Sequence, residues 1–287
     1  MDKVTVRDIV RMKGSSRIVM VTAYDYPTAK IVDSAGVDMI LVGDSLAMVV
    51  LGYPTTHGVT LRDMIRHTMA VARAKPRALV VGDMPFGSYE TSNSRAVRSA
   101  IAFVRAGAEA VKLEGGSEYA DRVKAIVRAG IPVMGHIGLT PQRHLRYGGY
   151  RPRGRRLEEV RQLLLDAEAL QEAGAFSIVI EFTAAEVAEL ITRRLQIPTI
   201  CIGSGPHCDG QVLVLHDILG LSDHIPPFAK KYVDLKQVIA QAVSSYVREV
   251  REGLFPGPEH TVVRLKEPLD LESLLKELEG GAPAKQC

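Results

Sequence analysis

Eight short apolar runs follow one another along the chain, with room for a helix between most of them. Several runs are continuously apolar instead of alternating, which is typical of parallel strands that are buried on both faces of a sheet. We therefore expect eight parallel strands. The runs are "RIVMVTAYD" (17–25), "DMILVGDS" (38–45), "RALVVGDMP" (77–85), "AVKLEG" (110–115), "IPVMGHIG" (131–138), "FSIVIEF" (176–182), "IPTICIGSG" (197–205) and "VLVLHDILG" (212–220).

The segments between these runs have apolar residues at i, i+3 and i+4 spacing, which predicts amphipathic helices. Eight strands that alternate with helices predict an α/β fold, a (β/α)8 TIM barrel. A doubly wound open sheet is the alternative that this pattern leaves open. Four helical segments close on a glycine that fits the position just after a helix: Gly36, Gly107, Gly130 and Gly174.

The domain organisation follows from the absence of any linker rich in Pro, Gly or Ser. We expect a single barrel domain over residues 1–262, which includes an N-terminal helix. Residues 263–287 differ in composition and predict a charged amphipathic helix outside the barrel, followed by a disordered tail of small residues.

Composition and charge narrow the function classes. A net charge of +3 at pH 7 is too small to indicate a nucleic-acid partner. No apolar run reaches the roughly 18 residues of a membrane span, and the N-terminus has no apolar signal region, so we expect a cytoplasmic protein without a membrane partner. Three cysteines do not suggest a disulfide framework, and we expect Cys201 to be a small buried apolar residue.

Carboxylates stand at the ends of four predicted strands. In barrels of this type the active site lies at the carboxyl ends of the strands, so Asp44, Asp83, Glu114 and Glu181 would converge on one mouth. Like charges at close range repel each other, and a cation would relieve that repulsion. Oxygen ligands without thiolates suit Mg²⁺, Mn²⁺ or Ca²⁺. The alternative is that each acid caps a loop or pairs with an arginine.

Three further polar residues lie near the same strand ends. Lys112 is two residues from Glu114, so it would face the same side of its strand and bind a substrate carboxylate or pair with an acid. Ser45 follows Asp44 directly, and its hydroxyl and backbone N–H could hold an anion. His136 lies in an otherwise apolar strand, where it is either a substrate contact or a core residue.

Three other segments carry weaker signals. Residues 143–156 hold six arginines, which indicates either a solvated basic loop or a flexible lid that attracts an anionic substrate. His216 and Asp217 stand in the last predicted strand and are more often structural. "GSGPHC" (203–208) lacks the third glycine of G-x-G-x-x-G, because Cys208 stands there, so we reject a dinucleotide site.

Ten segments together resemble one known family. The chain resembles the 3-methyl-2-oxobutanoate hydroxymethyltransferase (ketopantoate hydroxymethyltransferase) family from about residue 4 to about residue 261. Matches of this density are far more specific than a single motif. The segments are "VTAYD", "VGDSLAMVVLGYPTT", "VTLRDMIRHTMAVAR", "VVGDMPFGSYE", "VKLEGG", "PVMGHIGLTPQ", "GGYRPRGR", "IVIEF", "DGQVLVLHDILGL" and "PPFAKKY".

The resemblance implies a barrel of the phosphoenolpyruvate/pyruvate superfamily type and a defined reaction. It implies that a hydroxymethyl group passes from 5,10-methylenetetrahydrofolate to 3-methyl-2-oxobutanoate, through an enolate that Mg²⁺ stabilises. The product is 2-dehydropantoate, on the route to pantothenate and coenzyme A, and Glu181 is the proton acceptor. It further implies a cytoplasmic homo-oligomer, commonly a decamer. The sequence leaves open whether the one-carbon carrier is a folate or a related pterin.

The resemblance also implies roles for individual residues. Asp44 and Asp83 correspond to Mg²⁺ ligands, and Glu114 corresponds to a third metal-associated acid. Asp44, Ser45, Asp83 and Lys112 correspond to contacts with the keto acid. Two alternatives stay open: another Mg²⁺-dependent 2-oxo acid lyase or mutase of the same barrel superfamily, and a non-catalytic barrel that only binds an anion.

The chain departs from the family pattern at two loop positions. It has Ala47 where the family usually has glycine, and Ser204 where the family usually has alanine. Both departures concern loop shape and leave the acids in place.

Overall fold

The computed structural model describes residues 2–280 and divides the chain into two units, residues 1–234 and 235–287. Within the described part, the strands of the first unit form one closed barrel in which each strand is parallel to its neighbours and β8 closes on β1. The predicted (β/α)8 barrel is confirmed, and the open-sheet alternative is wrong. The strands are β1 (Ile18–Thr22), β2 (Met39–Val42), β3 (Leu79–Asp83), β4 (Ala110–Glu114), β5 (Val133–Gly138), β6 (Ser177–Glu181), β7 (Thr199–Ile202) and β8 (Gly210–Leu213).

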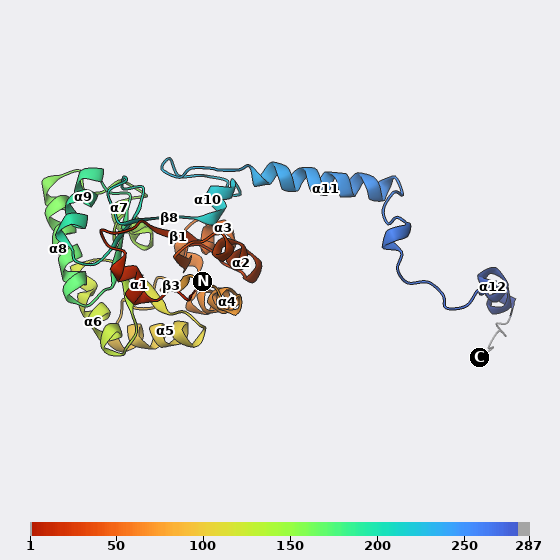
Figure 1. Ribbon diagram of the computed structural model, residues 1–287, viewed down its shortest axis with the longest axis horizontal. Helices are drawn as coiled ribbons and strands as arrows, with labels where there is room; N and C mark the ends of the chain where they lie inside the picture. The colour runs from red at the N-terminus through yellow and green to blue at the C-terminus, as the bar shows by residue number, and fades with distance from the viewer. Residues whose placement is uncertain (1, 281–287) are drawn as a thin grey trace. The chain divides into compact units, whose positions relative to one another are not determined.

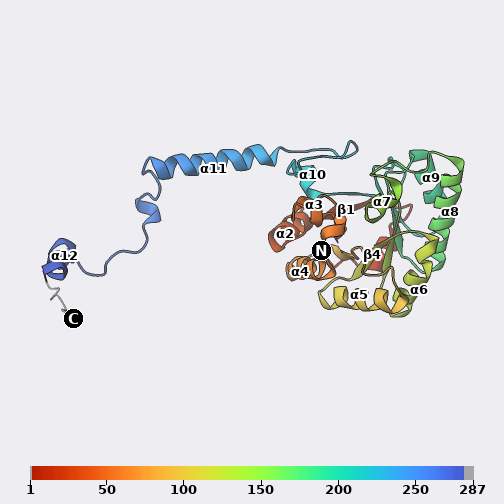
Figure 2. The same cartoon turned by 180° about the vertical axis from the view of Figure 1, so that it is seen from behind.

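Helices surround the strands, as Figures 1 and 2 show for α2, α4, α5, α6, α8 and α9. The α-helices of this unit are α1 (Val6–Arg11), α2 (Tyr26–Ser34), α3 (Leu46–Val49), α4 (Leu61–Arg73), α5 (Asn93–Arg105), α6 (Ala120–Arg128), α7 (His144–Tyr147), α8 (Leu157–Glu172), α9 (Ala185–Arg194) and α10 (Leu215–Leu219). The 3₁₀ helices are η1 (Thr56–Gly58), η2 (Ser117–Tyr119) and η3 (Pro141–Arg143). The four glycines expected after helices all have a positive φ.

Apolar side chains fill two regions of the barrel unit. One region lies between the strands and the surrounding helices, and the other fills the inside of the barrel. Ile9 of α1 joins the inner region beside Met39 and Leu79, the first residues of their strands. The N-terminal segment therefore covers the amino end of the barrel. The buried polar side chains of the interior lie at the carboxyl end.

The eighth strand starts and ends earlier than the sequence predicted. The expected run was 212–220, but β8 ends before His216 and Asp217, which lie on α10. Gly210 permits the early start, because a Cβ there would come within 2.5 Å of the Ile18 carbonyl oxygen and 2.8 Å of Ile200 Cδ1. The backbone can thus approach both neighbouring strands, and the placement of His216 and Asp217 in a strand is wrong.

The second unit contains α11 (Leu235–Arg251), η4 (Pro258–His260) and α12 (Leu271–Gly280). No side chain of α11 or α12 is buried within the chain. The domain boundary expected at residue 262 stays a prediction. The expected disordered end falls on residues 281–287, which lie outside the described residues, as does Cys287. Among residues 2–280, no helix has the length and apolar character that a membrane crossing requires.

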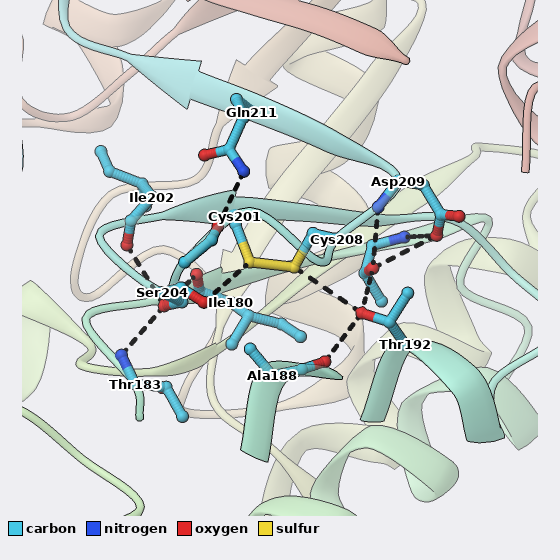
Figure 3. Close-up of a disulfide and its surroundings, with 12 residues drawn as sticks. Ile180, Thr183, Ala188, Thr192, Cys201, Ile202, Ser204, Cys208, Asp209 and Gln211 are labelled. Atoms are coloured by element: carbon cyan, nitrogen blue, oxygen red, sulfur yellow. Dashed lines mark hydrogen bonds between the residues drawn. A yellow bond between two sulfur atoms is a disulfide. The ribbon is translucent and has the colours of Figure 1, made fainter. Parts of the chain in front are cut away.

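A disulfide joins Cys201, in β7, to Cys208, just before β8 (Figure 3). The two Cα atoms are 5.6 Å apart, and both residues are fully buried. Cys201 is buried as expected, but the expectation that it is an unpaired apolar residue is wrong. The physical reason is topological. Residues 203–209 contain no helix, so the chain returns directly alongside β7 and brings residue 208 next to residue 201.

We predict that reduction of this disulfide destabilises the barrel. Closure of a short loop of this size restricts the unfolded chain and contributes about 2–3 kcal/mol to the free energy of unfolding. Guanidinium unfolding with and without dithiothreitol measures the difference. The Cys201→Ala/Cys208→Ala variant is the control, because its midpoint should not respond to dithiothreitol. An equal midpoint for oxidised and reduced wild type would contradict the prediction.

Candidate active site

Polar residues occupy the carboxyl end of the barrel interior. In β4, Ala110, Lys112 and Glu114 alternate on the inward face. Ala110 belongs to the apolar interior, whereas Lys112 and Glu114 follow it toward the carboxyl end and are 3% and 1% exposed. The strand register pairs Asp83 with Lys112 and Glu114 with His136. Side chains that are far apart in the sequence therefore lie next to each other in one mouth.

Lys112 and Asp83 form a buried ion pair. The Lys112 Nζ atom lies 2.6 Å from Asp83 Oδ1 and 2.7 Å from Oδ2. Burial raises the pKa of Asp83 to about 6; Lys112 opposes that rise and Asp44 adds to it. Burial by itself would lower the pKa of Lys112, but Asp83, Glu114 and Asp44 outweigh it and raise the pKa. Both members of the pair are thus ionised at neutral pH.

Asp44 lies directly beside this pair. Its backbone N–H donates to Asp83 Oδ2 over 3.2 Å, and its own Oδ2 accepts from Gln142 Nε2 over 2.9 Å. Burial, followed by repulsion from Glu114, raises the pKa of Asp44 to about 6. No hydrogen bond to the other oxygen, Oδ1, is found within residues 2–280, so this oxygen can accept a ligand.

His136 lies between two glutamates. Its Nδ1 is 3.5 Å from Glu114 Oε1, and its Nε2 is 3.2 Å from Glu181 Oε2. Burial and Lys112 would lower the pKa of His136, but the two glutamates outweigh them and raise it to about 9. The imidazole therefore carries a positive charge at neutral pH. The Glu181 side chain is 16% exposed, compared with 1% for Glu114, so Glu181 is the acid that a substrate can reach.

Ser45, directly after Asp44, contacts residues on the β1 side of the mouth. Its Oγ lies 2.9 Å from the hydroxyl of Tyr24, and the Tyr24 ring packs 5.5 Å from the His216 ring. Asp217 accepts a hydrogen bond from Ser222 over 2.5 Å. His216 and Asp217 make these local contacts, and the interpretation of them as structural residues stays a prediction.

Gln142 is a residue of the mouth that sequence reasoning missed. It is 2% exposed and lies in η3, after β5. Its side chain donates to Asp44, and its backbone N–H donates to Glu114 Oε2 over 3.0 Å. A buried glutamine in a loop carries no charge pattern that a sequence reading would notice. The only signal was its place at the end of "PVMGHIGLTPQ", one of the segments that resemble the family.

The donor set of the mouth fits a small divalent cation. Within residues 2–280, no group of three or more His, Cys, Asp and Glu side chains is arranged to hold a metal ion. Mg²⁺, however, is usually bound through one or two carboxylates plus waters and substrate oxygens. Asp44 Oδ1 offers such an oxygen, and the four acids exceed the charges of Lys112 and His136 by two. The role of Glu114 as a third ligand stays a prediction.

The arginine-rich segment forms ion pairs with acids of η2 and α8. Arg143 pairs with Glu118, and Arg153 pairs with Glu159 over 3.5 Å. A polar pocket of about 330 Å³ lies between this segment and α8, lined among others by Arg146. The mobility that a lid requires stays a prediction.

The comparisons with known proteins identify the family. The sequence matches the family described as ketopantoate hydroxymethyltransferase over residues 3–258. The chain belongs to this family. A 3-methyl-2-oxobutanoate hydroxymethyltransferase from Aeropyrum pernix is 70% identical over 94% of this chain and 98% of its own length. One from Ignicoccus hospitalis is 66% identical over 90% of this chain and 98% of its own length. The resemblance in the sequence is confirmed, and with it the expectation of a hydroxymethyltransferase.

Solved structures agree on the fold. The crystal structure of phosphonopyruvate hydrolase with oxalate and Mg²⁺ aligns over 100% of both chains with a TM-score of 0.61 and 13% identity. That of 2,3-dimethylmalate lyase, a member of the PEP mutase/isocitrate lyase superfamily, covers 98% of this chain and 100% of its own, with a TM-score of 0.57 and 19% identity. At these identities the likeness concerns the barrel fold alone.

We predict that Lys112→Met strongly destabilises the protein and that a second substitution, Asp83→Leu, recovers most of the lost stability. Removal of the ammonium group leaves Asp83 buried without its counter-ion, which costs about 3–5 kcal/mol. Lys112→Met/Asp83→Leu removes the uncompensated charge and should recover most of that stability. Denaturant unfolding measures both variants against Lys124→Met, an exposed control. A double variant no more stable than the single one would show that charge is not the cause.

Proposed function

We propose that this chain transfers a hydroxymethyl group from 5,10-methylenetetrahydrofolate to 3-methyl-2-oxobutanoate, which gives 2-dehydropantoate for pantothenate and coenzyme A biosynthesis. The observation that carries the proposal is the mouth itself. Buried Asp44, Asp83, Glu114 and Lys112 share it with a more exposed acid, Glu181, in a chain of this family. Such a set can bind an anionic keto acid, take one proton from it and stabilise the negative charge that remains.

The metal of the proposal is Mg²⁺. Asp44, through its unpartnered Oδ1, and Asp83 would hold it, with Glu114 nearby. When bound, Mg²⁺ would polarise the ketone of the substrate and stabilise developing negative charge. The excess negative charge of the mouth supports a cation of this valence.

Two residues fit the binding of the substrate carboxylate. The Lys112 ammonium group has three donors, and Asp83 accepts from two of them, so one remains for an anion. Ser45 can donate its hydroxyl proton when Tyr24 donates to its Oγ, since the two oxygens lie 2.9 Å apart. Both groups also fix the orientation of the keto acid, which lowers the entropic part of the barrier.

Glu181 is the proposed proton acceptor. Its Oε2 faces His136 over 3.2 Å, and no contact to Oε1 is found within residues 2–280. The proton from C3 of the keto acid would therefore go to Oε1. His136 would hold the carboxylate in place by its charge, which accounts for its position better than direct contact with the substrate.

The proposal includes a homo-oligomer, with a decamer as the expected form, in the cytoplasm. The support lies in the 17-residue helix α11, which exposes apolar side chains such as Val243, Tyr246 and Val250. An exposed apolar face of this length favours contact with another protein surface. Size-exclusion chromatography with light scattering measures the assembly.

A product assay tests the proposed function. Incubation with 3-methyl-2-oxobutanoate, 5,10-methylenetetrahydrofolate and Mg²⁺ should give 2-dehydropantoate, and omission of either the folate or Mg²⁺ should abolish it. A pterin carrier tested in parallel decides between the two one-carbon donors. Cleavage of a 2-oxo acid without any carrier would instead favour a lyase of the same barrel superfamily.

We predict that Glu181→Gln removes proton abstraction and spares binding. Wild type with Mg²⁺ should exchange the C3 proton of 3-methyl-2-oxobutanoate with solvent deuterium without folate. The glutamine keeps the shape and loses basicity, so exchange should fall about 10²–10⁴-fold, the range for one positioned base. NMR follows the exchange, and calorimetry checks keto-acid binding. Exchange at the wild-type rate would assign the base elsewhere.

A further inference from the structure

Gln142 is the uncharged residue that connects two of the buried acids in the mouth. Its amide contacts Asp44, and its backbone N–H contacts Glu114, although the two acids belong to different strand ends. Gln142 is 2% exposed, so each of its polar groups needs a partner within the protein. Its hydrogen-bond partners therefore indicate its function.

The orientation of the Gln142 amide is fixed by the chemistry of its neighbours. The Met84 carbonyl oxygen can only accept a hydrogen bond, so the atom 3.0 Å from it must be the amide nitrogen Nε2 of Gln142. On the opposite side, the Tyr89 hydroxyl donates to Oε1 over 2.7 Å. The second hydrogen of Nε2 is thereby directed at Asp44 Oδ2, 2.9 Å away. A flipped amide would place oxygen against two acceptors.

The same contacts close a ring around Glu114. The Glu114 backbone N–H donates to the Tyr89 hydroxyl over 3.3 Å, and the Gln142 backbone N–H donates to Glu114 Oε2 over 3.0 Å. The position of the Gln142 amide is thus tied to β4 through Tyr89 and to η3 through its own backbone.

We propose that Gln142 is a positioning residue, which holds Asp44 by Oδ2 so that Oδ1 is presented to the divalent cation and the keto acid. An amide suits this role, since it orients a carboxylate without neutralising it. A lysine or arginine at this place would remove the negative charge that the cation requires. The inference rests on the proposed function, because it concerns the ligands of the same cation.

Calorimetry of Mg²⁺ binding in the presence of 3-methyl-2-oxobutanoate tests the proposal. Gln142→Met keeps the length of the side chain and removes its donors. We expect its Kd for Mg²⁺ to rise about 10–100-fold, the usual effect of losing a residue that orients a metal ligand. The control is Gln171→Leu. The Gln171 side-chain oxygen accepts from the backbone N–H groups of Gln196 and Ile197 on the outside of the barrel. This variant should keep the wild-type Kd.

A second measurement separates positioning from structural damage. If Gln142 positions Asp44, excess Mg²⁺ should restore C3–H exchange in Gln142→Met, so the apparent KM for Mg²⁺ rises more than the maximal rate falls. Structural damage would lower the maximal rate at every Mg²⁺ concentration. Tyr89→Phe removes only the hydroxyl that orients the amide, and its Kd should lie between those of wild type and Gln142→Met.

The outcomes distinguish this proposal from the proposed function. No Mg²⁺ binding by wild type would contradict the proposed function itself. Wild-type binding with an unchanged Kd in Gln142→Met overturns the role of Gln142 alone. If Gln142→Met does not fold, Tyr89→Phe decides, and an unchanged Kd in that variant overturns the proposal.

Discussion

Negative charge that is buried at the carboxyl end of the barrel is the constraint on which the site depends. Asp44, Asp83 and Glu114 are each at most 5% exposed, where an unpaired carboxylate is costly to ionise. The protein offsets that cost with Lys112, with the charged His136, and with backbone and amide donors aimed at single carboxylate oxygens. The negative charge that these groups do not balance is the charge that a divalent cation would neutralise.

The barrel separates the residues that stabilise it from those that carry chemistry. Inward positions near the amino end, such as Met39 and Ala110, are apolar and pack against α1. In β4, the inward side chain two residues after Ala110 is Lys112, and the next one is Glu114. The strands β3, β5 and β6 make the same change, to Asp83, His136 and Glu181. Apolar burial at one end therefore stabilises the framework that keeps the charged groups together at the other. The energetic cost of the site is thus carried by a region that takes no part in the reaction.

The sequence predicted most of the fold and the acids of the site, and its errors have a common origin. The β-branched runs, the helical periodicity and the glycines after helices are local features, and the closed barrel confirms what they predicted. The unpaired state assumed for Cys201 and the strand assumed for His216 both required knowledge of how β7 and β8 pack. Gln142 was missed for the same reason, since its side chain contacts only segments that are distant in the sequence.

The sequence by itself determined the number and direction of the strands, the family, and which acids stand at the strand ends. Each of these follows from residues that are close together in the chain, or from the many family motifs along it. Only the tertiary structure decided that Lys112 neutralises Asp83, that His136 lies between Glu114 and Glu181, and which oxygen of Asp44 stays without a partner. The physical reason is that hydrogen bonds and ion pairs depend on distances of about 3 Å. Strand register and loop return set those distances, and residue spacing along the chain does not.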